Sequence, residues 1–148
     1  MKLSDLLQDP AVKASIVDHC TLLIDEQVAH KGGLTGMALK TAYRVVKGVG
    51  PTYVPGAIGR ILPEAFKALD PIWHEGLQQG DPVEYLIQHQ ARTADVILSV
   101  TDARVHKASG VVAGAYHQLR KSVKGDVEAA VPGLANIIGN HLQTLQNA

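Results

Sequence analysis

The chain has few aromatic residues, a single cysteine and no excess of charge of either sign. Aromatic residues make up 4% of its 148 residues and hydrophobic residues 46%, so a core has to come mainly from Leu, Ile, Val and Ala. That composition favours helices over a sheet-rich sandwich. The lone Cys20 excludes an internal disulfide, and a formal net charge of zero argues against a protein that coats polyanions over its whole surface.

Segments that would direct the chain to or through a membrane are missing from the sequence pattern. No apolar run reaches the ~18 residues that a transmembrane helix needs. The N-terminal segment carries Asp5 and Asp9 and lacks an apolar h-region, so we expect no signal peptide. With the unpaired cysteine, this predicts a cytoplasmic protein without integral membrane association.

Helix-start signals recur along the chain. Asp-Pro pairs at 9–10, 70–71 and 81–82 place a carboxylate beside the free N–H groups of a first turn, with proline where its missing N–H costs nothing. Apolar residues between these signals recur at helical spacing. We therefore predict an all-α fold with about six principal helices in one domain over residues 1–148. Pro63 and Asp70-Pro71 predict only short helices over 63–90.

Short landmarks of the first half recur in the same order in the second half. His30-Lys31 matches His106-Lys107, Ala42-Tyr43 matches Ala115-Tyr116, and Val54-Pro55-Gly56 matches Val131-Pro132-Gly133. The shared order predicts internal repeats over about 10–62 and 91–146, folded as two pseudo-symmetric three-helix halves that share one core. Tyr43 and Tyr116 lie on the apolar sides of their helices, so we expect both in the core.

The zero net charge conceals a segregation of charge along the chain. Residues 31–60 contain five cations and no acid, residues 103–125 again contain five cations and no acid, and all 14 acids lie elsewhere. The candidate anion-binding residues on or beside the two repeated helices are Lys40, Arg44, Lys47, Arg120, Lys121 and Lys124. If the halves are pseudo-symmetric, they form one surface for an acidic protein or another polyanion. The alternative is a solvated face whose cations pair with acids such as Asp18, Asp25 and Glu26.

No motif indicates catalysis, a cofactor or a metal. In Asp18-His19-Cys20 the thiol adjoins an imidazole, but neighbouring side chains of a helix point about 100° apart, and Cys20 is expected in the core. The seven histidines are scattered without metal-ligand spacing, and phosphate-loop, G-x-G-x-x-G and G-x-S-x-G motifs are missing. We expect no cofactor and no metal, and the sequence leaves enzymatic activity open while leaning against it.

Several stretches carry a resemblance to a known family. They are Met1 to Leu7, Leu39 to Tyr43, Leu62-Pro63-Glu64, Ala68 to Trp73 and Val100-Thr101-Asp102. Together they resemble a family of small uncharacterised bacterial proteins, common in actinobacteria, over most of the chain. The resemblance implies a bacterial, cytoplasmic, helical protein and transfers no site residue. The family's second basic helix is richer in lysine, whereas Gly114 and His117 interrupt it here, which weakens the polyanion hypothesis.

These observations predict a non-enzymatic interaction or regulatory protein that presents a repeated basic helix to an acidic partner. The first alternative is a helical carrier of a small apolar or amphipathic ligand held between the halves. The second alternative is an enzyme of unrecognised type. A weak homodimer is the expected oligomeric state.

Overall fold

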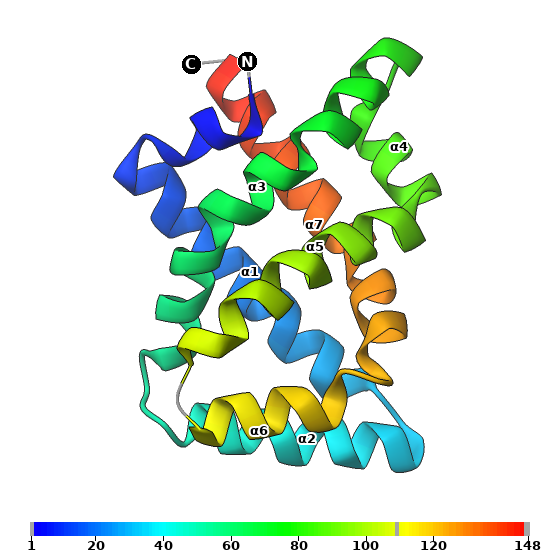
Figure 1. Cartoon of the computed structure of the whole chain (residues 1–148). Coiled ribbons are helices and arrows are strands. Elements are labelled where there is room, and N and C mark those ends of the chain that lie inside the picture. Colours follow the sequence, from blue (N-terminus) through cyan, green and yellow to red (C-terminus); the bar gives the residue numbers. More distant parts are fainter. Residues whose placement is uncertain (1, 109, 147–148) are drawn as a thin grey trace.

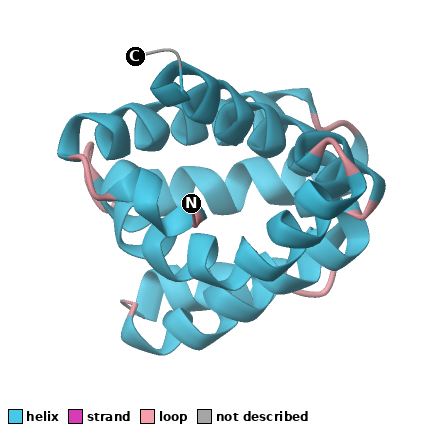
Figure 2. Ribbon diagram, turned by 90° about the horizontal axis from the view of Figure 1, so that it is seen from above, coloured by secondary structure: helices cyan, strands magenta, loops and turns pink. Residues whose placement is uncertain are grey.

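The computed structural model describes residues 2–108 and 110–146, which form helices joined by short loops (Figures 1 and 2). The elements are the 3₁₀ helix η1 (Leu3–Leu7), α1 (Pro10–His30), α2 (Gly33–Lys47), α3 (Tyr53–Gln79), α4 (Pro82–Gln88), α5 (Gln90–Arg104), the 3₁₀ helix η2 (Val105–Lys107), α6 (Gly110–Leu119) and α7 (Val123–Gln146). The all-α prediction is confirmed. Over the described residues there are seven α-helices rather than the six principal helices expected.

Two of the three Asp-Pro pairs begin helices as predicted. The Asp9 carboxylate accepts from the Ala11 N–H at 2.9 Å, and α1 starts at Pro10. Asp81 caps α4 in the same way by accepting from the Val83 N–H at 3.0 Å. Such side-chain acceptors satisfy N–H groups that have no partner within the helix.

The third pair does not begin a helix, because α3 continues through both of its prolines. Asp70 lies inside α3, and its carboxylate instead accepts the Leu3 N–H at 2.5 Å, which fastens η1 to α3. Pro63 and Pro71 are eight residues apart and exposed, so they lie close together on the outer face of α3. A proline on the outer face removes a backbone hydrogen bond on the solvent side of the helix. The helix then bends around the core without ending. The short helices expected over 63–90 are therefore wrong for 63–79.

One hydrophobic core joins η1, α1, α3, α4 and α7, and residues of α5 pack against it. Its buried side chains are Leu3, Leu6, Ile16, Cys20, Leu62, Phe66, Leu69, Ile72, Trp73, Leu86, Val131, Ala135 and Ile138. Cys20 is buried as predicted, and burial raises the pKa of its thiol to about 11. Across the described part of the chain, no helix is long and apolar enough to cross a membrane.

Helices α2 and α6 lie outside this core, within residues 2–108 and 110–146. They run side by side in opposite directions at the lower end of the molecule in Figure 1, below α1, α3, α5 and α7. Few of their residues are buried, namely Gly36, Leu39 and Ala42 on α2 and Ala115 on α6. We call these two helices the α2/α6 layer.

Candidate functional site

The α2/α6 layer is joined to α1 by a cluster of three polar side chains. Tyr43 on α2 donates its hydroxyl hydrogen to the Asp25 carboxylate on α1 at 2.5 Å. Lys47, one turn after Tyr43, lies 3.5 Å from the same carboxylate and 5.1 Å from the centre of the Tyr43 ring. Burial, followed by the hydrogen bond to Asp25, raises the pKa of Tyr43 well above its usual range, so its hydroxyl stays protonated and donates.

A second cluster of the same composition joins the layer to α5. Tyr116 on α6 donates to the Asp102 carboxylate on α5, and its hydroxyl also lies 2.8 Å from the Thr101 hydroxyl. Arg120 follows Tyr116 by one turn and contacts both oxygens of Asp102, at 2.8 and 3.0 Å. Arg120 and then Tyr116 lower the pKa of Asp102, while burial raises the pKa of Tyr116. Each Asp–Tyr–cation cluster thus ties one helix of the layer to the body.

The expectation that both tyrosines lie in the core, which rested on their apolar helix faces, is wrong. Both are half-buried and anchor the layer from outside the core cluster. Each ring packs against the body, but each hydroxyl ends at a carboxylate. An aspartate on the preceding helix satisfies the polar end of the side chain, which is the usual requirement for burying part of a tyrosine.

The six predicted anion-binding cations separate into two groups. Three of them are paired with acids, namely Lys47 with Asp25, Arg120 with Asp102, and Lys124 with Asp95 at 2.9 Å and Glu128 at 4.0 Å. The other three, Lys40, Arg44 and Lys121, are exposed and have no carboxylate partner among residues 2–108 and 110–146. Of the acids suggested as partners, Asp25 takes that role for Lys47.

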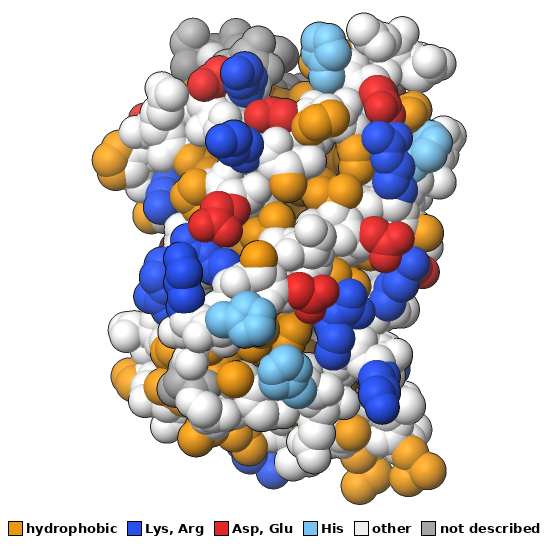
Figure 3. Space-filling model, in the orientation of Figure 1, with side chains coloured by type: hydrophobic (Ala, Val, Ile, Leu, Met, Phe, Trp, Pro, Cys, Tyr) orange, Lys and Arg blue, Asp and Glu red, His pale blue; other side chains and the backbone are white. Residues whose placement is uncertain are grey.

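The outer side of the layer is more apolar than the sequence pattern indicated. A shallow groove of about 820 Å³ runs between α2 and α6, with Met37, Ala38, Thr41 and Val45 on one wall and Val111, Gly114 and Gln118 on the other. Leu34, Met37 and Val111 are 86%, 66% and 59% exposed. Orange apolar side chains accordingly follow the lower edge of the molecule in Figure 3. The exposed apolar residues Leu34, Met37 and Val45 recur at helical spacing. This pattern is the sequence signal from which the apolar outer side could have been predicted.

The unpaired cations border this groove. Lys40 follows Met37 by three residues and Arg44 follows Thr41 by three, so each lies about one helical turn from a groove residue of α2. Lys121 lies just after the end of α6, close to groove residues Gln118 and Ser122 in the chain. The groove is therefore apolar along its centre and positively charged at its edges, and its own residues include no acid. We call the groove and these three cations the α2/α6 face.

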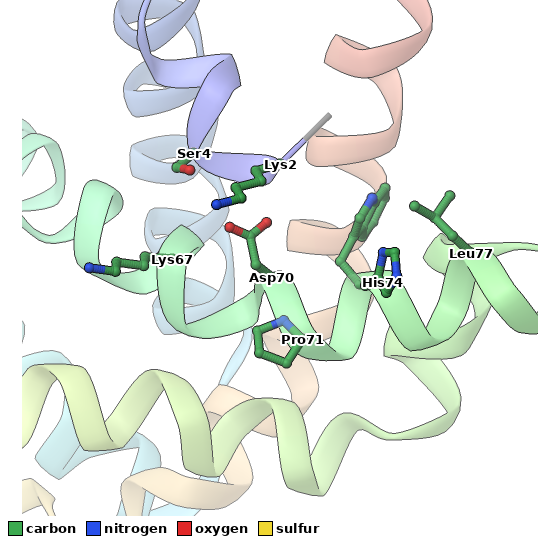
Figure 4. A pocket seen from close by; sticks show the side chains of 8 residues that line it. Lys2, Ser4, Lys67, Asp70, Pro71, His74 and Leu77 are labelled. Carbon is green, nitrogen blue, oxygen red and sulfur yellow. The ribbon is translucent and has the colours of Figure 1, made fainter.

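Another hollow, of about 450 Å³, lies between η1 and α3 at the opposite end of the molecule (Figure 4). Lys2, Lys67 and His74 line it, and the buried Trp73 contributes to its wall. Asp70 points from α3 toward the N-terminal segment, where it accepts the Leu3 N–H. The one carboxylate of this hollow thus has a structural role already, in holding η1 against the core.

Comparison with protein families places the chain in a family. The model of a family described as a family of unknown function (DUF6918) matches residues 3–142, from η1 through most of α7. No curated protein and no solved structure matches the chain.

Proposed function

The chain belongs to this family of unknown function, whose description assigns no activity, and we propose from the geometry that it is a non-enzymatic interaction protein. Its α2/α6 face binds an acidic amphipathic helix of a partner protein. The observation that carries this proposal is the apolar groove bordered by Lys40, Arg44 and Lys121. An apolar groove between two helices suits a third helix, whose apolar side fills it.

The charges of the face argue for an anionic partner and against a second copy of the chain. In a two-fold dimer through this face, the α2/α6 face of one copy would contact the same face of the other copy, since isologous contacts use the same residues on both subunits. Every charged residue at its edge is a cation, so the copies would repel each other. Acidic side chains beside an apolar stripe would instead meet Lys40 and Arg44 on one side and Lys121 on the other. The weak homodimer stays a prediction that this face does not support.

The proposal is tested with a synthetic 18-residue helical peptide that carries a Leu/Ala stripe flanked by glutamates. We expect salt-sensitive binding, which weakens about fivefold in the double variant Lys40→Gln/Arg44→Gln, because each exposed ion pair contributes a few tenths of a kcal/mol up to about 1. Gly114→Leu fills the groove. A Cβ at Gly114 meets no atom within 4 Å, so this variant should fold and lose peptide binding.

The matched control is Lys13→Gln/Lys67→Gln, which removes the same charge from outside the α2/α6 layer and should leave peptide binding unchanged. A second peptide with lysine in place of glutamate should not bind. Equal weakening by both double variants would reduce the effect to net charge and contradict the proposal. Binding to vesicles rich in phosphatidylserine without binding to the acidic peptide would also contradict it, and would assign the face to an anionic lipid surface.

The duplication adds a reason to expect one continuous face. The two Asp–Tyr–cation clusters use the matched Ala-Tyr pairs, and α2 and α6 contact each other. Both α1 and α5 contact both α3 and α7, as a two-fold relation between 10–62 and 91–146 would require. We therefore propose that residues 10–62 and 91–146 form two pseudo-symmetric halves.

The remaining functional predictions keep their place as alternatives. A carrier of a small apolar or amphipathic ligand stays an alternative, although the α2/α6 groove itself lies at the surface and does not enclose a ligand. An enzyme of unrecognised type has no particular observation in its favour. Bacterial origin and a cytoplasmic location are likewise proposals that rest on the sequence.

A further inference from the structure

A third hollow, of about 190 Å³, lies where α3 meets the end of α5, η2 and the inner side of α6. Three cations from three separate elements line it, namely Arg60 on α3, Arg104 on α5 and Lys107 on η2. The other walls are largely apolar, with Ala57, Ile61, Val105, Ala108 and Val112, and the hydroxyls of Thr101 and Tyr116 complete them. Figure 3 shows the densest group of blue side chains on the flank over α3 and the end of α5.

The three cations are only partly neutralised. Arg104 donates from Nε and Nη2 to one oxygen of Glu64, at 3.2 and 2.7 Å, which fixes its guanidinium at the wall. The pKa of Glu64 is lowered first by this hydrogen bond, and the charge of Lys107 contributes. Arg60 and Lys107 have no ion-pair partner within 4.0 Å in the described ranges, although Arg60 lies 5.9 Å from the Tyr53 ring centre. Three cations therefore face one carboxylate.

The matching lysine of the other half has a different environment. Lys31 occupies the same place in its His-Lys pair as Lys107, and it is bonded to Asp126 on α7. The chain thus provides an internal carboxylate for one lysine of the matched pair. Lys107 has no carboxylate within 4.0 Å in the described ranges and instead lines a hollow together with Arg60 and Arg104. The hollow therefore offers unpaired cations to an external anion.

We propose that the hollow lined by Arg60, Arg104 and Lys107 binds a small amphipathic anion, a carboxylate or phosphate monoester with a short hydrocarbon group. The guanidinium of Arg60 and the ammonium of Lys107 hold the head group, since both donate charge-assisted hydrogen bonds to carboxylates and phosphates. The apolar side chains, with Ile61, Val105 and Val112 the largest, contact the hydrocarbon part. The volume equals that of about six waters at ~30 Å³ each, which limits the ligand to a short chain.

The test titrates the full chain with hexyl phosphate, hexanoate, inorganic phosphate and hexanol while backbone amide signals are followed by nuclear magnetic resonance. We expect hexyl phosphate or hexanoate to shift the amides of Ala57, Ile61, Val105 and Ala108, and the tighter of the two identifies the head group. Lys107→Gln and Arg60→Gln should each weaken that binding about fivefold at low salt. Both side chains are exposed at the mouth of the hollow, so we expect both variants to fold.

The control Lys121→Gln removes the same charge from the α2/α6 face and should leave binding of the anion unchanged. Conversely, Lys107→Gln should leave binding of the acidic peptide unchanged, so this inference and the proposed function fail or succeed separately. Equal binding of hexanol would exclude a role for the cations, and equal binding of inorganic phosphate would exclude one for the apolar walls. Either result overturns the proposal, as does binding that neither Lys107→Gln nor Arg60→Gln weakens.

Discussion

Two tyrosine–aspartate hydrogen bonds help to attach the α2/α6 layer to the body, so removing them should loosen the layer selectively. Tyr43→Phe and Tyr116→Phe keep the rings and delete only the hydroxyls. A hydrogen bond to a charged group contributes about 1.5–3 kcal/mol. Asp25 and Asp102 keep Lys47 and Arg120 in the variants, so the lower end, about 1.5 kcal/mol for each variant, is the better expectation.

The measurement is native-state hydrogen exchange at single amides. A loss of about 1.5 kcal/mol in the free energy of local opening speeds exchange about tenfold. Because α2 and α6 contact each other, each single variant should speed exchange in both helices, and the double variant more than either one. Core amides of α3 and α7 that exchange by local opening should keep their rates, since the core cluster includes no residue of the layer within the described ranges.

The matched control is Tyr53→Phe. The Tyr53 hydroxyl has no hydrogen-bond partner in the part of the chain that the structure describes, and its ring contact with Arg60 survives in phenylalanine. Exchange in the layer should not change in this variant. If Tyr43→Phe and Tyr116→Phe left the layer's exchange unchanged, or raised that of α3 and α7 by the same factor, the two clusters would not be local anchors and the reasoning would be refuted.

Two further predictions concern the stability of the whole chain. Gly76→Ala should destabilise it by about 1–3 kcal/mol in urea unfolding, because a Cβ there lies 2.7 Å from the Pro82 Cα, whereas Gly114→Ala meets nothing within 4 Å and should not. The pKa of Asp102 is lowered from 3.8 by Arg120, so its contribution to stability is present above about pH 4 and is lost as the pH falls through the folded-state pKa. In Asp102→Asn the free energy of unfolding should therefore fall less steeply as the pH drops below 4. An unchanged pH dependence in this range would contradict the role given to Asp102.

The sequence predicted those parts of the fold that depend on local interactions. The carboxylates of Asp9 and Asp81 accept backbone N–H groups two residues further along the chain. Their capping role could therefore be recognised from adjacent residues. Asp70-Pro71 has the same local pattern but differs in context. The apolar residues on both sides of it pack in the core and keep α3 helical, and its carboxylate bonds a backbone group 67 residues away. Local rules could not distinguish this pair from the other two.

The candidate site was predictable only in part, for a similar reason. The spacing of Lys40 and Arg44 along one helix identified exposed cations, but whether a cation is paired depends on the neighbouring helix. The equal four-residue spacings from Tyr43 to Lys47 and from Tyr116 to Arg120 were visible, yet the sequence did not indicate that both ends meet an aspartate. The hollow was not predictable, because α3, α5 and η2 bring its cations together only in the folded chain.

The bond between Leu3 and Asp70 has a consequence for the order of folding. Leu3 and Leu6 are 1% and 0% exposed, so they close the core from one side. The Asp70 carboxylate that accepts the Leu3 N–H lies 67 residues further along the chain. Contacts so distant in sequence form late, because the loop between them must first be closed. Leu3→Ala and Leu6→Ala should therefore speed unfolding and hardly slow folding, which makes the docking of η1 onto α3 a late step of folding.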